Sequence, residues 1–239
     1  MNKYLKLTVL SMASVLVFSS ANAQEFKGKR YSPSGENPDN VYFGDTHIHS
    51  SLSVDASLWG MNKSPADIYR YAKGEELTSF MGWQAKLIRP LDFTVIADHS
   101  DAYGFFDLIA EGADFIVAEP QGARWHQLFK DGENAQLADE VIKALGIEDL
   151  PWNVNKKEFI EPGWKKSVEA AEAANDPGKF TAFIGYEWSS NPDGDNMHRV
   201  VIYRDNADKT LQVLPATTMF QPKTNNAQDP ETLWKTMQA

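Results

Sequence analysis

The stretch RPLDFTVIADHSD, residues 89–101, decides the fold class of this chain. Its apolar run, residues 91–97, lies between a proline and an aspartate, which predicts a buried β-strand. The carboxyl end of this strand carries Asp98, His99 and Asp101. Polar side chains at that end are typical of α/β proteins, because their functional sites lie at the carboxyl ends of the strands.

The same pattern recurs along the chain. Runs of β-forming residues predict further strands over residues 41–49, 179–190 and 198–205. Capping residues and helical periodicity predict helices over residues 64–74, 133–146, 161–176 and 229–238. Strands that alternate with helices favour an α/β fold with a mostly parallel sheet or a barrel.

Composition narrows the classes of function. The 239 residues are 42% hydrophobic and 23% charged, with a formal net charge of −10, so one sizeable core is expected. An acidic chain lacks the basic surface that phosphate backbones need, so we expect no nucleic-acid partner. Cysteine is absent, so stability comes from core packing or bound metal, and any metal is held by nitrogen and oxygen atoms.

The first 23 residues have the order of a secretory signal peptide. Two lysines precede an apolar run, and Ala21-Asn22-Ala23 follows it, which predicts cleavage after Ala23 and a periplasmic or secreted protein. The run is too short to span a bilayer comfortably, so we expect no stable membrane insertion; an uncleaved anchor is the alternative. Residues 24–40 are rich in Pro, Gly and Asn and predict an extended arm.

Potential metal ligands cluster beside the predicted strands. In a strand, residues i and i+2 point to the same face, so His47 and His49 can direct both rings at one ion. Each cluster alone has a structural explanation, such as a surface histidine or a helix cap. Their combination beside four strands favours a metal site. The candidates are His47, His49, Asp55, Asp98, His99, Glu187 and His198.

His198 stands at the amino end of its predicted strand and therefore fits the rule of carboxyl-end sites less well than the others. The fifth histidine, His126, lies on a predicted helix, and we expect a structural role for it. Imidazole and carboxylate ligands suit Zn, Mn and Fe alike, and carboxylates such as Glu187 or Asp55 can bridge two ions. The expected cofactors are therefore two or three divalent metal ions.

Three segments together resemble the polymerase and histidinol phosphatase (PHP) superfamily of metal-dependent phosphoesterases. They are DTHIHSSLSVDA (45–56), FTVIADHSD (93–101) and FIGYEWSSNPDGDNMHRVVIY (183–203). The chain looks closest to a large secreted bacterial branch catalogued as a domain of unknown function. The resemblance implies that residues 41–239 form a PHP-like metal-dependent hydrolase domain with a distorted (β/α)7 barrel.

The resemblance also implies roles for individual residues. His47 and His49 would bind one metal, Glu187 would bridge two, and His99, Asp55 and His198 would complete the ligand set. Asp98 would orient its neighbouring ligand. Apart from the resemblance, we predict Asp98 and Arg199 as the catalytic residues. The family pattern continues with a further histidine and a final Asp-x-His, which do not follow His198 here, so we expect a barrel truncated at its carboxyl end.

The predicted function is hydrolysis of a small-molecule phosphate mono- or diester by metal-activated hydroxide. A basic residue would help to neutralise the phosphate, and the candidates near the motifs are Lys86, Arg89 and Arg199. Two alternatives stay open at this point. One is an amidohydrolase-like enzyme that cleaves C–N or C–O bonds, and the other is an inactive metal-binding fragment.

Overall fold

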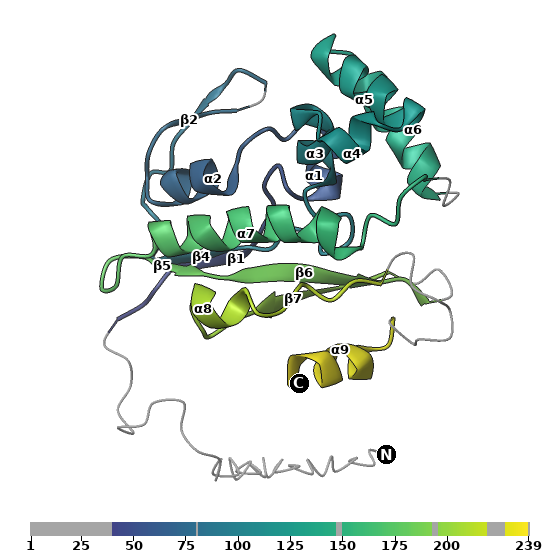
Figure 1. Ribbon diagram of the computed structural model, residues 1–239. Coiled ribbons are helices and arrows are strands. Elements are labelled where there is room, and N and C mark those ends of the chain that lie inside the picture. Colours follow the sequence, from purple (N-terminus) through teal and green to yellow (C-terminus); the bar gives the residue numbers. More distant parts are fainter. Residues whose placement is uncertain (1–39, 80, 147–149, 193–195, 219–227, 239) are drawn as a thin grey trace, which may run out of the picture. The chain divides into compact units, whose positions relative to one another are not determined.

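The computed structural model describes residues 40–79, 81–146, 150–192, 196–218 and 228–238 (Figure 1). The predicted signal peptide and nearly all of the predicted arm lie outside the described residues. The chain divides into two units, residues 1–41 and 42–239, and every helix and strand described below belongs to the second. None of the described helices is both long and apolar enough to cross a membrane.

A three-stranded parallel sheet forms the centre of the second unit. Its order is β1 (Gly44–Ile48), β4 (Phe93–Ile96) and β5 (Thr181–Phe183). After Ile184 the chain continues as β6 (Gly185–Ser190), which pairs antiparallel with β7 (Met197–Ile202). A third pairing joins the short strands β2 (Leu77–Thr78) and β3 (Gln84–Ala85) as an antiparallel hairpin.

The predicted strand over residues 179–190 is therefore divided into β5 and β6, but its register against β4 does not change. Val95 pairs with Phe183 in the sheet, and an isolated parallel bridge joins His99 to Glu187. The backbone hydrogen bonds agree, because the Glu187 N–H donates to the Asp98 carbonyl at 2.9 Å. The polar segment after β4 thus lies directly beside β6.

Helices surround this sheet in the order that the sequence predicts, with additional short ones. α2 begins with the capping box expected at Ser64, whose Oγ accepts from the Asp67 N–H at 3.3 Å. α7 begins four residues before its predicted start, so Pro162 lies inside it. The helices are α1 (Val54–Leu58), α2 (Pro65–Ala72), α3 (Phe105–Glu111), α4 (Asp114–Val117), α5 (Pro120–Lys130), α6 (Asn134–Gly146), α7 (Lys157–Ala174), α8 (Ala207–Thr210) and α9 (Pro230–Gln238).

One face of the sheet is packed against α7, which runs along it in Figure 1. Ile96, Tyr186 and Trp188 from the strands join Trp164 and Val168 from α7 in a buried cluster. Since side chains alternate along a strand, His99 and Glu187 must point to the opposite face. A second buried cluster, centred on Phe105 and Trp125, holds α3, α5 and α6 together.

The structure confirms the predicted α/β class. The strands of the described residues do not close into a barrel. The antiparallel direction of β7 explains the position of His198. The amino end of an antiparallel strand meets the carboxyl ends of its neighbours, so His198 pairs across the sheet with Ser189. His126 lies on α5, where its Nδ1 is 2.7 Å from the Ile109 carbonyl oxygen.

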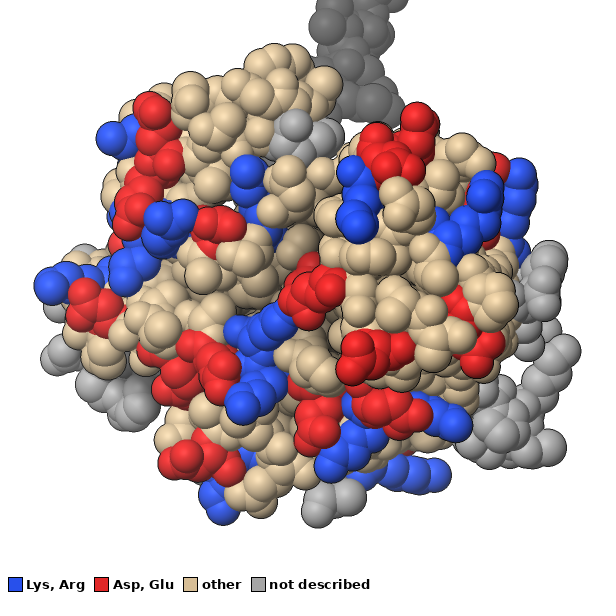
Figure 2. Space-filling view, turned by 45° about the horizontal axis from the view of Figure 1, so that its top comes forward, with Lys and Arg blue, Asp and Glu red and all other residues tan. Residues whose placement is uncertain are grey.

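Charged side chains are distributed evenly on the face shown in Figure 2. Lysine and arginine are interspersed there with aspartate and glutamate. Ion pairs between exposed side chains include Arg124 with Glu140 at 2.6 Å and Lys166 with Glu111 at 2.6 Å. Surface pairs of this kind contribute little stability, so the two buried clusters carry most of it.

Gly185 fixes the close approach of β4, β6 and β7. A Cβ atom at this position would lie 2.5 Å from Val95 Cγ1 and 2.6 Å from the Val201 carbonyl oxygen. We predict that Gly185→Ala lowers the free energy of unfolding by about 1–3 kcal/mol, because neither neighbour can move without disturbing the sheet.

Urea denaturation in the presence of a chelator measures this loss without a contribution from bound metal. The exposed exchange Lys209→Ala is the control and should change the free energy of unfolding by less than about 0.5 kcal/mol. Equal midpoints for Gly185→Ala and the control would show that the strands are not closely packed here.

Candidate metal centre

The end of β1 brings two histidines to the face of the sheet opposite α7. A register shift in the pairing of β1 with β4 lies between Asp45 and Ile48. Ile48 then pairs with Ile96 and packs against the sheet's buried cluster. His47 and His49, one residue to either side, therefore point away from that cluster, as the H-x-H spacing predicts.

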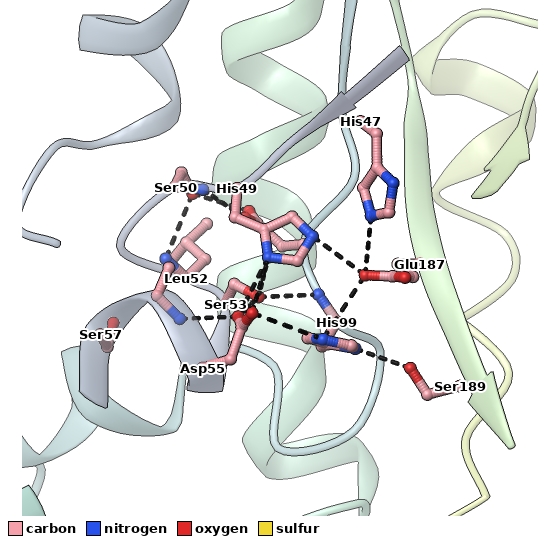
Figure 3. A network of polar contacts seen from close by, with 12 residues as sticks. His47, His49, Ser50, Leu52, Ser53, Asp55, Ser57, His99, Glu187 and Ser189 are labelled. Carbon is pink, nitrogen blue, oxygen red and sulfur yellow. Dashed lines mark hydrogen bonds and ion pairs between the residues drawn. The ribbon is translucent and has the colours of Figure 1, made fainter. Parts of the chain in front are cut away.

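Glu187 is the centre of the site. The isolated bridge to His99 places it on β6 directly beside the segment that follows β4. Glu187 is only 1% exposed. Its Oε2 lies 3.0 Å from His47 Nε2, 2.9 Å from His49 Nε2 and 3.4 Å from His99 Nε2 (Figure 3). Its Oε1 lies 2.7 Å from His198 Nδ1. One carboxylate thus contacts four imidazoles.

None of these four contacts has the geometry of a hydrogen bond. Both carboxylate oxygens of Glu187 and the Nε2 of His49 are buried and have no hydrogen-bond partner. Buried polar atoms in folded proteins are nearly always hydrogen-bonded, and an ion is one of the accepted explanations for an exception. A shared cation needs several ligand atoms that lie close together and are not hydrogen-bonded to one another.

Asp55 forms the second acidic part of the site. It lies in the first turn of α1, and its Oδ1 is 3.0 Å from His49 Nδ1 while its Oδ2 is 3.6 Å from His99 Nε2. Ser53 connects these groups, since its Oγ–H donates to Asp55 Oδ1 at 2.6 Å and its Oγ accepts from the His99 N–H at 3.0 Å. The turn after β1 is thereby attached to the segment after β4.

Ser189 supports the site from β6. Its Oγ lies 2.7 Å from His99 Nδ1 and 3.2 Å from His198 Nδ1. The contact with Ser189 occupies Nδ1 of His99 and so fixes which ring nitrogen carries the proton. The other nitrogen, Nε2, then faces Asp55 and Glu187.

The six candidate ligands form three overlapping groups. Within each group the donor atoms lie within 4.8 Å of one another. Such groups of imidazole and carboxylate donors can each hold a metal ion. They are His47 with His49 and Glu187, His49 with Asp55 and His99, and His99 with Glu187 and His198.

The electrostatics of the ion-free site keep its acids ionised. Burial alone would raise the pKa of Glu187, but its contacts with His49 and His47 lower that pKa to about 2. Burial alone would lower the pKa of His49, but Asp55 and Glu187 raise it to about 10. The pKa of Asp55 is likewise well below its usual range, because His49 and His99 outweigh its burial. The site therefore strongly favours positive charge.

The two residues assigned to catalysis point elsewhere. Asp98 is fully buried, and its carboxylate accepts from the Ser50 N–H at 2.5 Å, from Ser50 Oγ at 2.7 Å and from Tyr103 OH at 3.4 Å. Burial raises the pKa of Asp98 to about 6, although the bonds from Ser50 oppose the increase. The Arg199 guanidinium donates to the His198 carbonyl at 2.6 Å. Neither side chain is a member of the three groups.

The other predicted cations also lie outside these groups. Arg89 donates to Asp92 Oδ2 at 2.9 Å, and its guanidinium carbon is 4.6 Å from the centre of the Phe43 ring. Lys86 is exposed next to β3. Ser53 and Ser189 are the supporting residues that the sequence reading missed. Ser189 could have been found, because it stands at i+2 from Glu187 and so shares its face of the strand.

Comparison with known protein families gives a match over most of the chain. A family model described as "Protein of unknown function (DUF3604)" matches residues 36–239. The chain matches none of the curated proteins and none of the solved structures with which it was compared.

Glu187 should be the most sensitive residue for metal binding, since its carboxylate, unlike that of Asp55, belongs to two of the three groups. We predict that Glu187→Gln weakens metal affinity at least about a hundredfold, because a neutral amide leaves the cation without its buried counter-charge. Competition with a chromogenic chelator measures the affinity. Glu133→Gln, an exposed exchange before α6, should bind as the unaltered chain does; equal affinity in both variants would contradict the assignment.

Metal binding should also release a proton. A histidine ligand must be neutral, whereas Asp55 and Glu187 hold His49 protonated up to a pKa of about 10. Affinity should therefore rise with pH throughout the neutral range and level off only near that pKa. Calorimetric titration with Zn²⁺ in buffers of different ionisation enthalpy should show about one proton released from His49. His49→Gln should remove this release, and an unchanged count would refute it.

Proposed function

Because the chain belongs to the DUF3604 family, whose function is unknown, its activity must be argued from the site, and we propose that it is a metal-dependent phosphoesterase. The substrate would be a small-molecule phosphate mono- or diester. The observation that carries the proposal is the buried Glu187 carboxylate, which contacts four imidazoles without a single hydrogen bond.

The donor set fits divalent cations. Nitrogen and oxygen donors without sulfur suit Zn, Mn and Fe, and the three overlapping groups could hold two or three ions, with the Glu187 carboxylate able to serve two of them. When bound, such ions supply Lewis-acid chemistry, which activates water at neutral pH and neutralises negative charge on a phosphate.

The exposure of the ligands gives a substrate access to this site. The Glu187 side chain is 1% exposed, whereas those of His47, Asp55 and His198 are 48%, 45% and 36% exposed. The cluster is thus sealed on the side of β6 and open on the other. Structural metal sites are closed, while catalytic ones keep an accessible position, so this asymmetry favours catalysis.

The surrounding residues of the chain orient the ligands. Ser189 holds the His99 ring through Nδ1, and Ser53 holds Asp55 and the backbone of His99. Asp98 supports the ligands without contacting the site. Its hydrogen bonds with Ser50 connect the residue after His49 to the residue before His99. Asp98 is therefore proposed as a positioning residue that keeps the two histidine segments together.

The order of the motifs supports the reaction class. H-x-H, A-D-H, G-x-E and a histidine within the next strand occur in the sequence order of the PHP superfamily, and this order favours phosphoesters over the amides and lactones of amidohydrolases. The placement of α7 and the ligands on opposite faces of the sheet agrees with a distorted (β/α)7 barrel, whose helices lie outside. The predicted signal peptide would place this activity in the periplasm or outside the cell.

We predict that the metal-loaded protein hydrolyses 4-nitrophenyl phosphate or bis(4-nitrophenyl) phosphate, that a chelator abolishes turnover and that added Mn²⁺ or Zn²⁺ restores it. His49→Gln should lower kcat/KM at least about a hundredfold. Loss of this ligand would weaken binding of the ions that stabilise negative charge on the phosphate. Release of 4-nitrophenolate measures the rate, and His126→Gln on α5 is the matched control.

The outcomes separate the three hypotheses. Turnover of lactones or amides without turnover of phosphoesters would establish the amidohydrolase-like alternative. Stoichiometric metal without turnover of either class would indicate a metal-binding role alone.

A further inference from the structure

The backbone hydrogen bonds between β6 and the segment after β4 stop just before Ser189. The Glu187 N–H donates to the Asp98 carbonyl, and the Ser100 N–H donates to the Glu187 carbonyl, both at 2.9 Å. Between parallel strands such bonds recur at every second residue. The next one would therefore join the Ala102 N–H to the Ser189 carbonyl.

The chain turns away at Ala102 instead. This buried residue has a φ of 54°, in the left-handed region that residues other than glycine seldom adopt. Its N–H donates to Asn155 Oδ1 at 2.9 Å. Backbone of this kind is costly and persists only where the surrounding structure holds it, often at functional sites. The Ser189 carbonyl is thereby left to a different donor.

The Thr218 hydroxyl is that donor. Its Oγ1–H donates to the Ser189 carbonyl at 2.7 Å, in place of the backbone N–H. Thr218 is held in turn by Asp101, which is only 5% exposed. Asp101 Oδ1 accepts from the Thr218 N–H at 2.9 Å and from Asn155 Nδ2 at 2.8 Å, while its Oδ2 lies 3.1 Å from Thr218 Oγ1. Since the hydroxyl has one hydrogen and its shorter contact is with Ser189, the Thr218 N–H is the bond that fixes Thr218 to Asp101.

Ser189 connects this arrangement to the candidate metal centre. Its Oγ lies 2.7 Å from His99 Nδ1 (Figure 3) and 3.2 Å from His198 Nδ1. Both histidines belong to the candidate metal group that Glu187 completes. A displacement of the Ser189 backbone would move its hydroxyl and so change how both rings face Glu187.

We propose that Asp101 is a positioning residue for the group of His99, Glu187 and His198. It fixes Thr218, whose hydroxyl fixes the Ser189 carbonyl. Ser189 in turn orients the two imidazole rings. The inference rests on the proposed function, because it takes metal ions to bind at this centre, but it does not depend on which bond they help to cleave.

A matched pair of threonine variants tests the proposal through metal affinity. Titration with Co²⁺, followed by visible absorption, gives the dissociation constant without reference to turnover. Thr218→Val removes the hydroxyl and keeps the size of the side chain, so we expect it to weaken Co²⁺ binding about tenfold. Thr210→Val on α8 is the control, because it also removes a hydroxyl that donates to a backbone carbonyl, that of Asn206 at 2.9 Å. The control should bind Co²⁺ as the unaltered chain does.

Two further backgrounds show which metal group is affected. His47→Gln disables the group of His47, His49 and Glu187, and the full effect of Thr218→Val should remain there. His198→Gln disables the group that Ser189 orients, and most of the effect should disappear. A loss of equal size in both backgrounds would indicate a general weakening of the fold.

Variants of Asp101 separate hydrogen bonding from charge. An asparagine carbonyl can still accept from the Thr218 N–H, and its amide can donate to the Thr218 hydroxyl oxygen, whereas alanine does neither. Asp101→Ala should therefore weaken Co²⁺ binding as Thr218→Val does, and Asp101→Asn should bind as the unaltered chain does. Equal losses in both Asp101 variants would assign the effect to charge and overturn the proposal. Circular dichroism verifies folding, and Thr218→Val decides the question if Asp101→Ala does not fold.

The outcomes also distinguish the inference from the function on which it rests. Unchanged affinity in Thr218→Val, or a loss of equal size in both histidine backgrounds, would overturn the positioning role and leave the phosphoesterase proposal intact. Failure of the unaltered chain to bind Co²⁺ would overturn both. Turnover of lactones or amides alone would refute the phosphoesterase and leave the role of Asp101 in place.

Discussion

The structure depends on the compensation of one buried negative charge, the carboxylate of Glu187. An ionised carboxylate at 1% exposure is tolerated only with a nearby positive charge or strong hydrogen bonds, and Glu187 has none of the latter. Protonated histidines could supply the charge, but the rings of His47, His49 and His99 lie only 5.1–5.2 Å from one to the next. Several imidazolium ions at this separation would repel one another. A divalent cation would remove the conflict, because every ring would then bind in its neutral form.

The sheet provides this arrangement through its register. Unchanged pairing from β4 through the His99–Glu187 bridge brings two side chains together that are 88 positions apart in the sequence. The antiparallel partner β7 then adds His198 at the same end of the sheet. Gly185 permits this packing, since a larger residue would collide with β4 and β7. The site is therefore a consequence of strand pairing.

The sequence predicts much of this, because strand periodicity and helix caps are local properties. The H-x-H spacing places His47 and His49 on one face, and the predicted strands bear the ligands at their ends. The same alternation explains the orientation of Asp98 and Arg199. Each is adjacent to a histidine that faces the candidate ligands, so its own side chain points to the other face. The interruption at Ile184 and the packing of α3–α6 are set by contacts distant in sequence, which single-sequence periodicity does not contain.

The short helix α1 connects the chemistry to the rest of the fold. Five residues are too few to form a stable helix alone, so tertiary contacts must hold α1 in place. Ser57 Oγ–H donates to the Ser51 carbonyl at 2.6 Å, and Val54 packs against the cluster around Phe105. Asp55 is thus positioned by the α3–α6 layer, whereas Glu187 is positioned by the sheet. The geometry of the candidate metal centre therefore depends on the packing of both layers, and helices that contribute no ligand still determine where Asp55 stands.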